Sequence, residues 1–260
     1  MIKFSESNKN QIVESIRLNR ALLIDFDGTL VDYSLNERRA LEKLFESLNL
    51  PEELFTNVHN EYSKINNYYW SQFELKKLTI EEVQYKRFAD LMSKHNIEGD
   101  ARELNKTYLD YLVQTTRIEK NILEAIKNLR DSGIKIVIIT NGIHWTQTER
   151  LKNTGLDKII DTFFTSESVG FAKPHPKMFL DSKKFLESID CPTNDLWVIG
   201  DNFEADIKGA FNVGYKTCWV NKNHSSNSSQ LYEDSQVPTL IANNFLEFVE
   251  FYNNVKYSES

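Results

Sequence analysis

Short apolar runs alternate with amphipathic stretches along most of this chain. The runs lack helical spacing and end at polar or glycine-containing segments; they cover residues 21–24, 134–139, 161–165, 196–199 and 216–220. Such runs predict strands that are buried on both faces. Helical patterns lie before, between and after them, at about 8–20, 119–131, 145–154, 176–189, 204–212 and 243–254. Strands that alternate with helices indicate βαβ units. We therefore predict an α/β fold with a doubly wound, Rossmann-like parallel sheet of five strands.

A long helical block follows the first predicted strand. Residues 34–116 carry apolar positions at helical spacing and contain no convincing strand. Two segments that precede apolar residues at helical spacing have the Ser/Thr-x-x-Glu pattern of a capping box, in which the first side chain and the glutamate bond each other's backbone N–H. These segments are Ser34 to Glu37 and Thr79 to Glu82. We expect a helix to start at each.

The position of this block predicts a two-part architecture. A core α/β domain would comprise residues 1–32 and 117–260, and an all-helical cap domain would comprise residues 33–116. Open parallel sheets bind ligands at the carboxyl ends of their strands. Because the insert leaves the core at that edge, we expect it to cover a binding site. The Asn- and Ser-rich segment 221–236 predicts a surface loop before the last helix.

Composition excludes several classes of protein. The net charge of −7 provides no basic surface of the kind that nucleic-acid binders show, so a nucleic-acid polymer is not an expected partner. No segment approaches the ~18 consecutive apolar residues of a membrane span, and the polar start has no signal-peptide core. Cys191 and Cys218 are the only cysteines, which favours free thiols in a reducing compartment. We expect a cytoplasmic protein that contacts no membrane.

Polar residues follow three of the predicted strands. Asp25 and Asp27 end the first, and because alternate residues of an extended strand face the same side, both carboxylates should point into one crevice. Thr140-Asn141-Gly142 follows the second strand, and Gly200-Asp201 follows the fourth, with Asp206 five positions later. Singly, each group is explained by a turn or a helix cap. Together, at equivalent positions of one sheet, they predict a shared site.

The chemistry of this group predicts a magnesium site that accepts a phosphate. A cluster of carboxylates needs a cation, and an all-oxygen ligand set suits Mg²⁺. Lys173, between Gly170 and Pro174, is placed to pair with a bound anion and with the carboxylates. Thr140 offers a hydroxyl, and the backbone N–H groups near Asn141 and Gly142 offer donors to phosphate oxygens.

These segments resemble the four motifs of the haloacid dehalogenase superfamily, in order and over the whole predicted core. The motifs are Asp-Phe-Asp-Gly-Thr-Leu-Val-Asp at 25–32, Ile-Thr-Asn-Gly at 139–142, Lys173-Pro174, and Gly200-Asp201 with Asp206. Further segments are similar to the pyrimidine 5′-nucleotidase branch, whose members dephosphorylate nucleoside monophosphates, non-canonical pyrimidine nucleotides included. They are 140–155, 166–173 and 217–221, with a looser likeness at 67–70 and 79–88 of the insert.

The resemblance implies a two-step reaction on a small phosphomonoester. Asp25 would be the nucleophile that forms an aspartyl-phosphate, and Asp27 the general acid and base. Mg²⁺ would be held by Asp25, the backbone carbonyl of Asp27 and Asp201. Lys173 and Thr140 would orient the phosphoryl group. Asp206 would position Lys173 or a metal-bound water.

Several alternatives stay open at this stage. A sugar-phosphate phosphatase or a phosphomutase of the same superfamily would use the same residues, whereas a dehalogenase would need neither the metal nor Asp27. A phosphate-accepting signalling domain also clusters aspartates and a lysine on a doubly wound sheet, but it would have no use for Asp27 as an acid or for a long insert. In the insert, the aromatic residues Tyr68, Tyr69, Trp70 and Phe73 are interpreted as core or as a stacking surface for a base.

Overall fold

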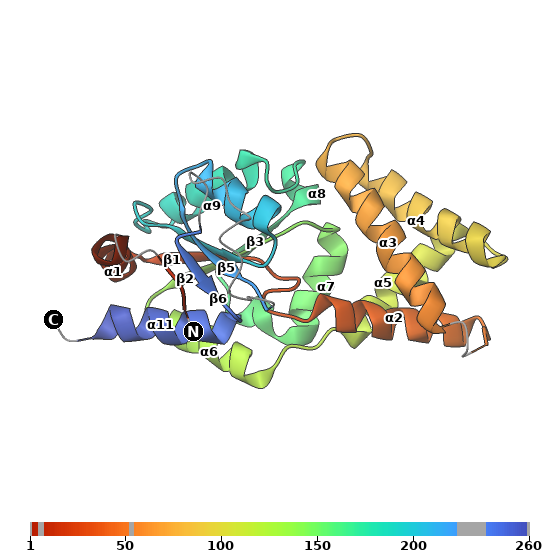
Figure 1. Ribbon diagram of the computed structural model, residues 1–260, viewed down its shortest axis with the longest axis horizontal. Helices are drawn as coiled ribbons and strands as arrows, with labels where there is room; N and C mark the ends of the chain where they lie inside the picture. Colours follow the sequence, from red (N-terminus) through yellow and green to blue (C-terminus); the bar gives the residue numbers. More distant parts are fainter. Residues whose placement is uncertain (1, 5–7, 52–54, 223–237, 259–260) are drawn as a thin grey trace. The chain divides into compact units, whose positions relative to one another are not determined.

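The computed structural model describes residues 2–4, 8–51, 55–222 and 238–258 (Figure 1). Its centre is a parallel sheet with the strand order β3-β2-β1-β4-β5-β6. The strands are β1 (Ala21–Ile24), β2 (Lys135–Thr140), β3 (Thr162–Thr165), β4 (Trp197–Gly200), β5 (Lys216–Val220) and β6 (Leu240–Ala242). The predicted α/β class and the parallel sheet are therefore confirmed. The loop expected at 221–236 falls almost wholly outside the described residues.

The sheet has one strand more than the five predicted. β6 pairs in parallel with β5, and its Ile241 also exchanges two backbone hydrogen bonds with Lys3, at 3.0 and 2.9 Å. Three residues are too few to show a periodic pattern in the sequence. The strand exists because backbone groups distant in the chain complete its hydrogen bonds.

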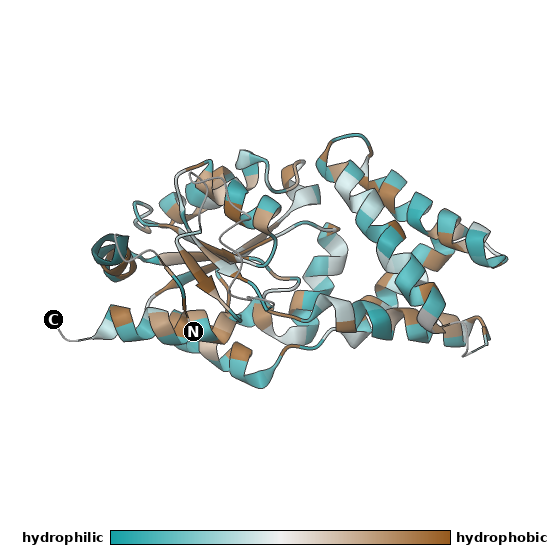
Figure 2. Ribbon diagram, in the orientation of Figure 1, coloured by the Kyte–Doolittle hydropathy of each residue, from teal (hydrophilic) through white to brown (hydrophobic). Residues whose placement is uncertain are grey.

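Helices cover both faces of the sheet, as buried parallel strands require. In Figure 1, α8 and α9 lie on one side of the strands and α6 and α11 on the other. The helices that accompany the sheet are α1 (Lys9–Leu18), α6 (Lys120–Asp131), α8 (Ser166–Val169), α9 (Pro176–Ser188), α10 (Gly209–Phe211) and α11 (Phe245–Tyr257). Side chains alternate along β1, so Leu23 belongs to the same buried cluster as Phe179 of α9, while Leu22 and Ile24 point to the other face. The strands are accordingly the brown centre of Figure 2.

The chain divides into two compact units, one built on the sheet and one wholly helical. The sheet unit comprises residues 1–31, 118–141 and 155–260, and the helical unit comprises residues 32–117 and 142–154. The helical unit contains α2 (Tyr33–Ser47), α3 (Phe55–Glu74), α4 (Ile80–His95), α5 (Ala101–Thr115) and α7 (His144–Thr154). No helix of the described segments combines the length and the apolar character that crossing a bilayer requires.

Helix α7 packs with the inserted helices although it follows β2 in the chain. Its Arg150 is buried and donates from Nε to the Thr116 hydroxyl at 2.9 Å. Asn153 donates to the Val113 carbonyl at 2.9 Å. These bonds tie α7 to the end of α5. The helical unit therefore holds a segment that begins directly after Asn141.

Of the two expected capping boxes, one is confirmed and one is wrong. Thr79 caps α4, and Thr79 and Glu82 bond each other's backbone N–H groups. Helix α2 instead begins at Tyr33, and the Asp32 carboxylate caps it by accepting from Leu35 N–H at 3.1 Å. With Asp32 in that role, the Glu37 side chain is free to turn into the interior of the helical unit.

Glu37 belongs to a buried polar network inside the helical unit. Its carboxylate accepts from the Ser63 hydroxyl at 2.7 Å and from the Asn66 amide at 3.3 Å. The Arg87 guanidinium donates to Asn66 Oδ1 at 2.9 Å and to Asn105 Oδ1 at 2.6 Å. All of these groups except Ser63 are at least nine-tenths buried. The network joins α2, α3, α4 and α5 through one carboxylate and one guanidinium.

Candidate active site

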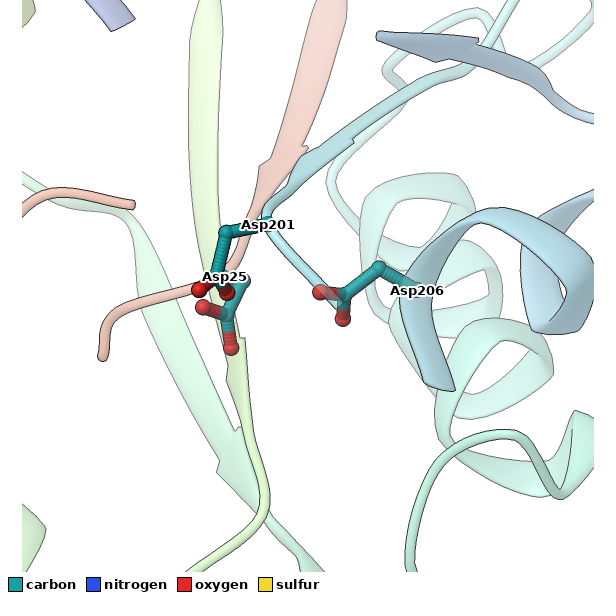
Figure 3. Close-up of side chains that lie close together, drawn as sticks. All are labelled: Asp25, Asp201 and Asp206. Carbon is teal, nitrogen blue, oxygen red and sulfur yellow. The ribbon is translucent and has the colours of Figure 1, made fainter. Parts of the chain in front are cut away.

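Three carboxylates converge at the carboxyl end of the sheet. Asp25 follows β1 and Asp201 follows β4, and the two strands are neighbours with Ile24 paired to Ile199. Asp206 lies on the π-helical turn Phe203–Lys208 and points toward the other two (Figure 3). One carboxylate oxygen of each lies within 4.8 Å of the others. The sheet therefore brings together three of the acidic residues that the sequence predicts for the site.

Asp25 is buried and held from three directions. Its backbone N–H donates to the Ile199 carbonyl at 2.9 Å, which continues the pairing of β1 with β4. Its Oδ2 accepts from the Thr29 hydroxyl at 3.1 Å, and its Oδ1 accepts from Lys173 Nζ at 2.7 Å. Sequence reasoning missed Thr29. The signal was Gly28, whose positive φ of 87° turns the chain back so that Thr29 reaches Asp25.

Lys173 is the cation of the site. Its side chain is only 2% exposed, and Nζ lies 2.7 Å from Asp25 Oδ1, 2.7 Å from Asp206 Oδ1 and 2.8 Å from the Ile139 carbonyl. Burial by itself would lower the pKa of Lys173, but the charges of Asp206 and Asp25 outweigh it and raise the pKa above its ordinary value. Lys173 therefore stays protonated at neutral pH.

Asn141 holds the backbone that carries Lys173. Its amide donates to the Lys173 carbonyl at 3.0 Å, and its oxygen accepts from the Lys173 N–H at 2.8 Å. Thr140, the last residue of β2, is buried beside it. A Cβ on Gly142 would come within 2.8 Å of the Gln147 amide, so no larger residue fits there without movement. The roles of Thr140, Asn141 and Gly142 in binding phosphate stay predictions.

The protein disfavours the ionised forms of Asp25 and Asp201. Burial raises the pKa of Asp25 well above its usual value; Lys173 opposes this rise, whereas Asp206 and Asp201 add to it. Although solvent reaches the Asp201 side chain, desolvation by the surrounding protein, followed by the charge of Asp206, raises its pKa to about 7. The charge of Asp27 contributes to the same rise. The charge of one lysine does not balance this set of acids, so the cluster could hold a further cation.

The donor set fits a hard divalent ion. All three side chains offer oxygen, the ligand atom that Mg²⁺ prefers. The glycines of the motifs leave room for these carboxylates: a Cβ on Gly28 would lie 2.1 Å from Asp201 Oδ2, and one on Gly200 would lie 2.2 Å from Asp206 Oδ2. Two backbone positions are thus kept bare so that the acids can approach one another. Lys173 lies 2.7 Å from both Asp25 and Asp206, so the ion pair does not distinguish these two carboxylates as ligands. The assignment of Asp25 and Asp201 as direct ligands stays a prediction.

The aromatic residues of α3 lie mostly outside the core of the helical unit. Tyr68 is 58% exposed, and its ring meets that of Tyr69 edge-on at a centroid distance of 5.2 Å. Trp70 and Phe73 are half-buried and form a second edge-on pair at 5.6 Å. Tyr69 alone of the four packs against that core. For the exposed Tyr68 the interpretation as a core residue is therefore wrong, whereas Trp70 and Phe73 are partly buried.

The family follows from a comparison with known proteins. A family model described as haloacid dehalogenase-like hydrolase matches residues 19–214, which include Asp25, Lys173 and Asp206. This chain belongs to the haloacid dehalogenase-like hydrolases. The family membership inferred from the motifs is thereby confirmed, and the protein is an enzyme of the hydrolase class.

Relatives in this family show what the chain resembles. It is 32% identical to the HAD-hydrolase YfnB of Bacillus subtilis over 85% of this chain and 92% of YfnB. A crystal structure of YfnB bound to magnesium has a TM-score of 0.76 and covers 90% of this chain and 99% of its own. Pyrimidine 5′-nucleotidase PynA of Streptococcus pneumoniae is 29% identical to this chain, over 88% of this chain and 98% of PynA. Glyceraldehyde 3-phosphate phosphatase of Pyrococcus furiosus is also 29% identical to this chain, over 78% of this chain and 81% of the phosphatase.

Proposed function

We propose that this protein is a Mg²⁺-dependent phosphomonoesterase that hydrolyses nucleoside 5′-monophosphates, with a preference for pyrimidines, through an aspartyl-phosphate on Asp25. The observation that carries the proposal is the placement of Lys173 Nζ at 2.7 Å from both Asp25 and Asp206, beside Asp201. In the proposed reaction this arrangement would provide a nucleophile, a positive charge and a carboxylate pair for a metal ion in one place. Those are the parts that phosphoryl transfer needs.

The first step would transfer the phosphoryl group to Asp25. A carboxylate oxygen of Asp25 attacks phosphorus, the bond from phosphorus to the ester oxygen breaks, and the leaving alkoxide takes a proton from Asp27. The ammonium of Lys173 offsets the charge on the phosphoryl oxygens. The hydroxyl of Thr140 and the backbone N–H groups of residues 141 and 142 would orient them. Thr29 orients the Asp25 carboxylate through its hydrogen bond.

The second step would release inorganic phosphate. Water attacks the aspartyl-phosphate, Asp27 takes the proton from that water, and Asp25 returns to its carboxylate form. Mg²⁺, held by Asp25, Asp201 and the backbone carbonyl of Asp27, would neutralise phosphoryl oxygens during both steps. Asp206 keeps Lys173 in position through the ion pair at 2.7 Å.

Two relatives support different substrates. PynA is by name a pyrimidine 5′-nucleotidase, and it matches over 88% of this chain. The Pyrococcus furiosus relative is by name a glyceraldehyde 3-phosphate phosphatase, with the same identity over 78% of this chain. We favour the nucleotide because the similarity to PynA runs over more of both chains. A sugar-phosphate phosphatase is the second candidate.

A substrate screen tests the proposal. Phosphate release is measured with Mg²⁺ for pyrimidine and purine nucleoside 5′-monophosphates and for a set of sugar phosphates, with the Asp25→Asn variant as the blank. We expect the highest kcat/KM for pyrimidine monophosphates and loss of turnover when the metal is chelated. Equal or higher kcat/KM on sugar phosphates would reject the nucleotidase in favour of the second candidate. Turnover that persists unchanged without divalent cations would show that the reaction does not require a metal ion.

Substitution of Asp27 distinguishes an enzyme that hydrolyses phosphomonoesters from a domain that only accepts a phosphoryl group. In the Asp27→Asn variant we expect kcat for a monoester to fall by about 10²- to 10⁴-fold, because the leaving alkoxide is no longer protonated. An activated substrate such as p-nitrophenyl phosphate has a leaving group that needs less protonation, so its first step should fall less. The two substrates are compared under single-turnover conditions. Unimpaired turnover of the nucleotide by the variant would show that Asp27 is not the acid and base.

A further inference from the structure

Trp219 contacts the backbone of the residue that carries the Asp201 carboxylate. It lies on β5, where the sheet pairs it with Gly200, the residue before Asp201. Its indole Nε1 donates to the Asp201 carbonyl oxygen at 2.8 Å. A side chain of the neighbouring strand therefore completes a hydrogen bond at the point where the β4 backbone leaves the sheet.

The same indole holds a second point of the loop from Asp201 to Asp206. The Phe203 ring meets Trp219 edge-on at a centroid distance of 5.1 Å. Within the loop, the Asn202 N–H donates to Asp206 Oδ2 at 3.1 Å, so the backbone conformation next to Asp201 also places the Asp206 carboxylate. A shift of this backbone would move both carboxylates at once.

The orientation of the Asp201 carboxylate depends on its own backbone more than the orientations of the Asp25 and Asp206 carboxylates do. The carboxylates of Asp25 and Asp206 are buried and each lies 2.7 Å from Lys173, whereas the Asp201 side chain is exposed and lies over Gly28. The direction in which it presents its oxygens follows from the main chain of residue 201. We propose that Trp219 is a positioning residue that, through its indole N–H, orients Asp201 as a ligand for the divalent ion.

This inference rests on the proposed function, since it assigns Trp219 to the metal site of that function. It requires a measurement of metal affinity that is independent of turnover. We suggest titrating the full chain with Mn²⁺, monitored by electron paramagnetic resonance of the free ion, and with Mg²⁺, monitored by calorimetry. The variants are Trp219→Phe and the chain with 3-benzothienylalanine at 219, which keeps the size of the indole but has sulfur in place of the N–H.

In both variants we expect the Kd for Mn²⁺ and Mg²⁺ to rise by about tenfold, because loss of groups that orient metal ligands typically weakens metal binding by 10- to 100-fold. Trp145→Phe is the matched control, because Trp145 is 50% exposed on α7 in the helical unit. The Kd of this variant for Mn²⁺ and Mg²⁺ should match that of the wild type. Far-UV circular dichroism and the melting temperature without metal establish that each variant is folded. If Trp219→Phe fails this check, the benzothienylalanine chain decides the result.

Three results would overturn a proposal, each in a different way. Unchanged Kd values in a folded chain with benzothienylalanine at 219 would show that the N–H does not orient Asp201. A Kd for Trp145→Phe that rises as much as that for Trp219→Phe would show a general effect of removing an indole. Absence of Mn²⁺ and Mg²⁺ binding by the wild type would instead reject the metal site of the proposed function, and the role of Trp219 with it.

Discussion

Replacing Asp25 by asparagine is expected to lower kcat for phosphomonoester hydrolysis by at least about 10⁴-fold, with the enzyme saturated in Mg²⁺ and substrate. An amide oxygen is a poor nucleophile and forms no stable bond to phosphorus. The change is close to isosteric. Thr29 can still bond the side chain at position 25, and Lys173 keeps its ion pair with Asp206. The loss should therefore come from chemistry and not from disturbed geometry.

Stability provides the internal check on Asp25→Asn. The pKa of Asp25 is raised, chiefly by burial, so the fold disfavours its ionised form. Removing that charge should leave the melting temperature of the metal-free protein unchanged or higher, the pattern expected when stability is sacrificed for activity. Calorimetry on the metal-free variant measures this. Asp25→Glu is the matched control for charge, since it keeps a carboxylate but displaces it, and it should also be inactive. Retention of more than about one hundredth of wild-type kcat by Asp25→Asn would exclude the aspartyl-phosphate.

Arg87→Met is expected to destabilise the helical unit by about 3–5 kcal/mol, the usual cost of removing one member of a buried ionic network. The guanidinium is 2% exposed and bonds Asn66 and Asn105. Its loss would remove the donors to two buried amide oxygens and one positive charge near the Glu37 carboxylate, which also lies 3.9 Å from His59 Nε2. Urea unfolding of the full chain measures the free energy, and hydrogen exchange of α3 and α4 locates the loss.

The pH dependence of this variant tests the electrostatic part of the prediction. Burial raises the pKa of Glu37, an effect that hydrogen bonds from Ser63 and Tyr33 and, after them, the charges of His59 and Arg87 partly offset. Without Arg87 the pKa of Glu37 should rise further. A carboxyl group whose folded-state pKa is raised binds more protons in the folded state, so the stability deficit should shrink as the pH falls from 7.5 to 5.

Two variants control the Arg87 experiment. The double variant Arg87→Met with Glu37→Gln removes the buried charge and should recover part of the lost stability, and the double-mutant cycle measures the coupling. Arg102→Met removes an exposed arginine of α5 that stacks on Tyr85 at 4.6 Å, and it should cost less than about 1 kcal/mol. A loss for Arg87→Met no larger than that for Arg102→Met would show that the network carries no stability.

The predictable part of the site consists of residues that local sequence places at strand ends. β1 ends directly before Asp25, and β4 ends directly before Asp201. Because parallel strands end at one edge, the pattern of apolar runs was sufficient to expect these carboxylates in one place. The same reasoning holds for Thr140 and Asn141, at the end of β2. Lys173 was identified by its place between a glycine and a proline and by the motif around it.

The residues missed by sequence reasoning act through contacts that no local pattern records. Trp219 was expected in a strand and in the segment 217–221 that resembles the nucleotidase branch. It was not expected beside the site, because its bond to the Asp201 carbonyl depends on the register of β5 against β4. Glu37 was expected in a capping box, because the competition from Asp32 for that role and the attraction of Ser63 appear only in the folded helical unit. Arg87 has the spacing of an ordinary helical residue. Its partners come from two other helices.

For this protein the sequence by itself determined the α/β class, the helical insert and the acidic edge of the sheet, since each follows from the spacing of apolar residues along a short stretch of chain. The tertiary structure decided the sixth strand, the packing of α7 with the inserted helices, and the position of Lys173 between Asp25 and Asp206. Asp25 and Lys173 lie 148 positions apart in the chain. Their distance of 2.7 Å depends on sheet order, burial and the hydrogen bonds of Asn141, which act together only in the folded state.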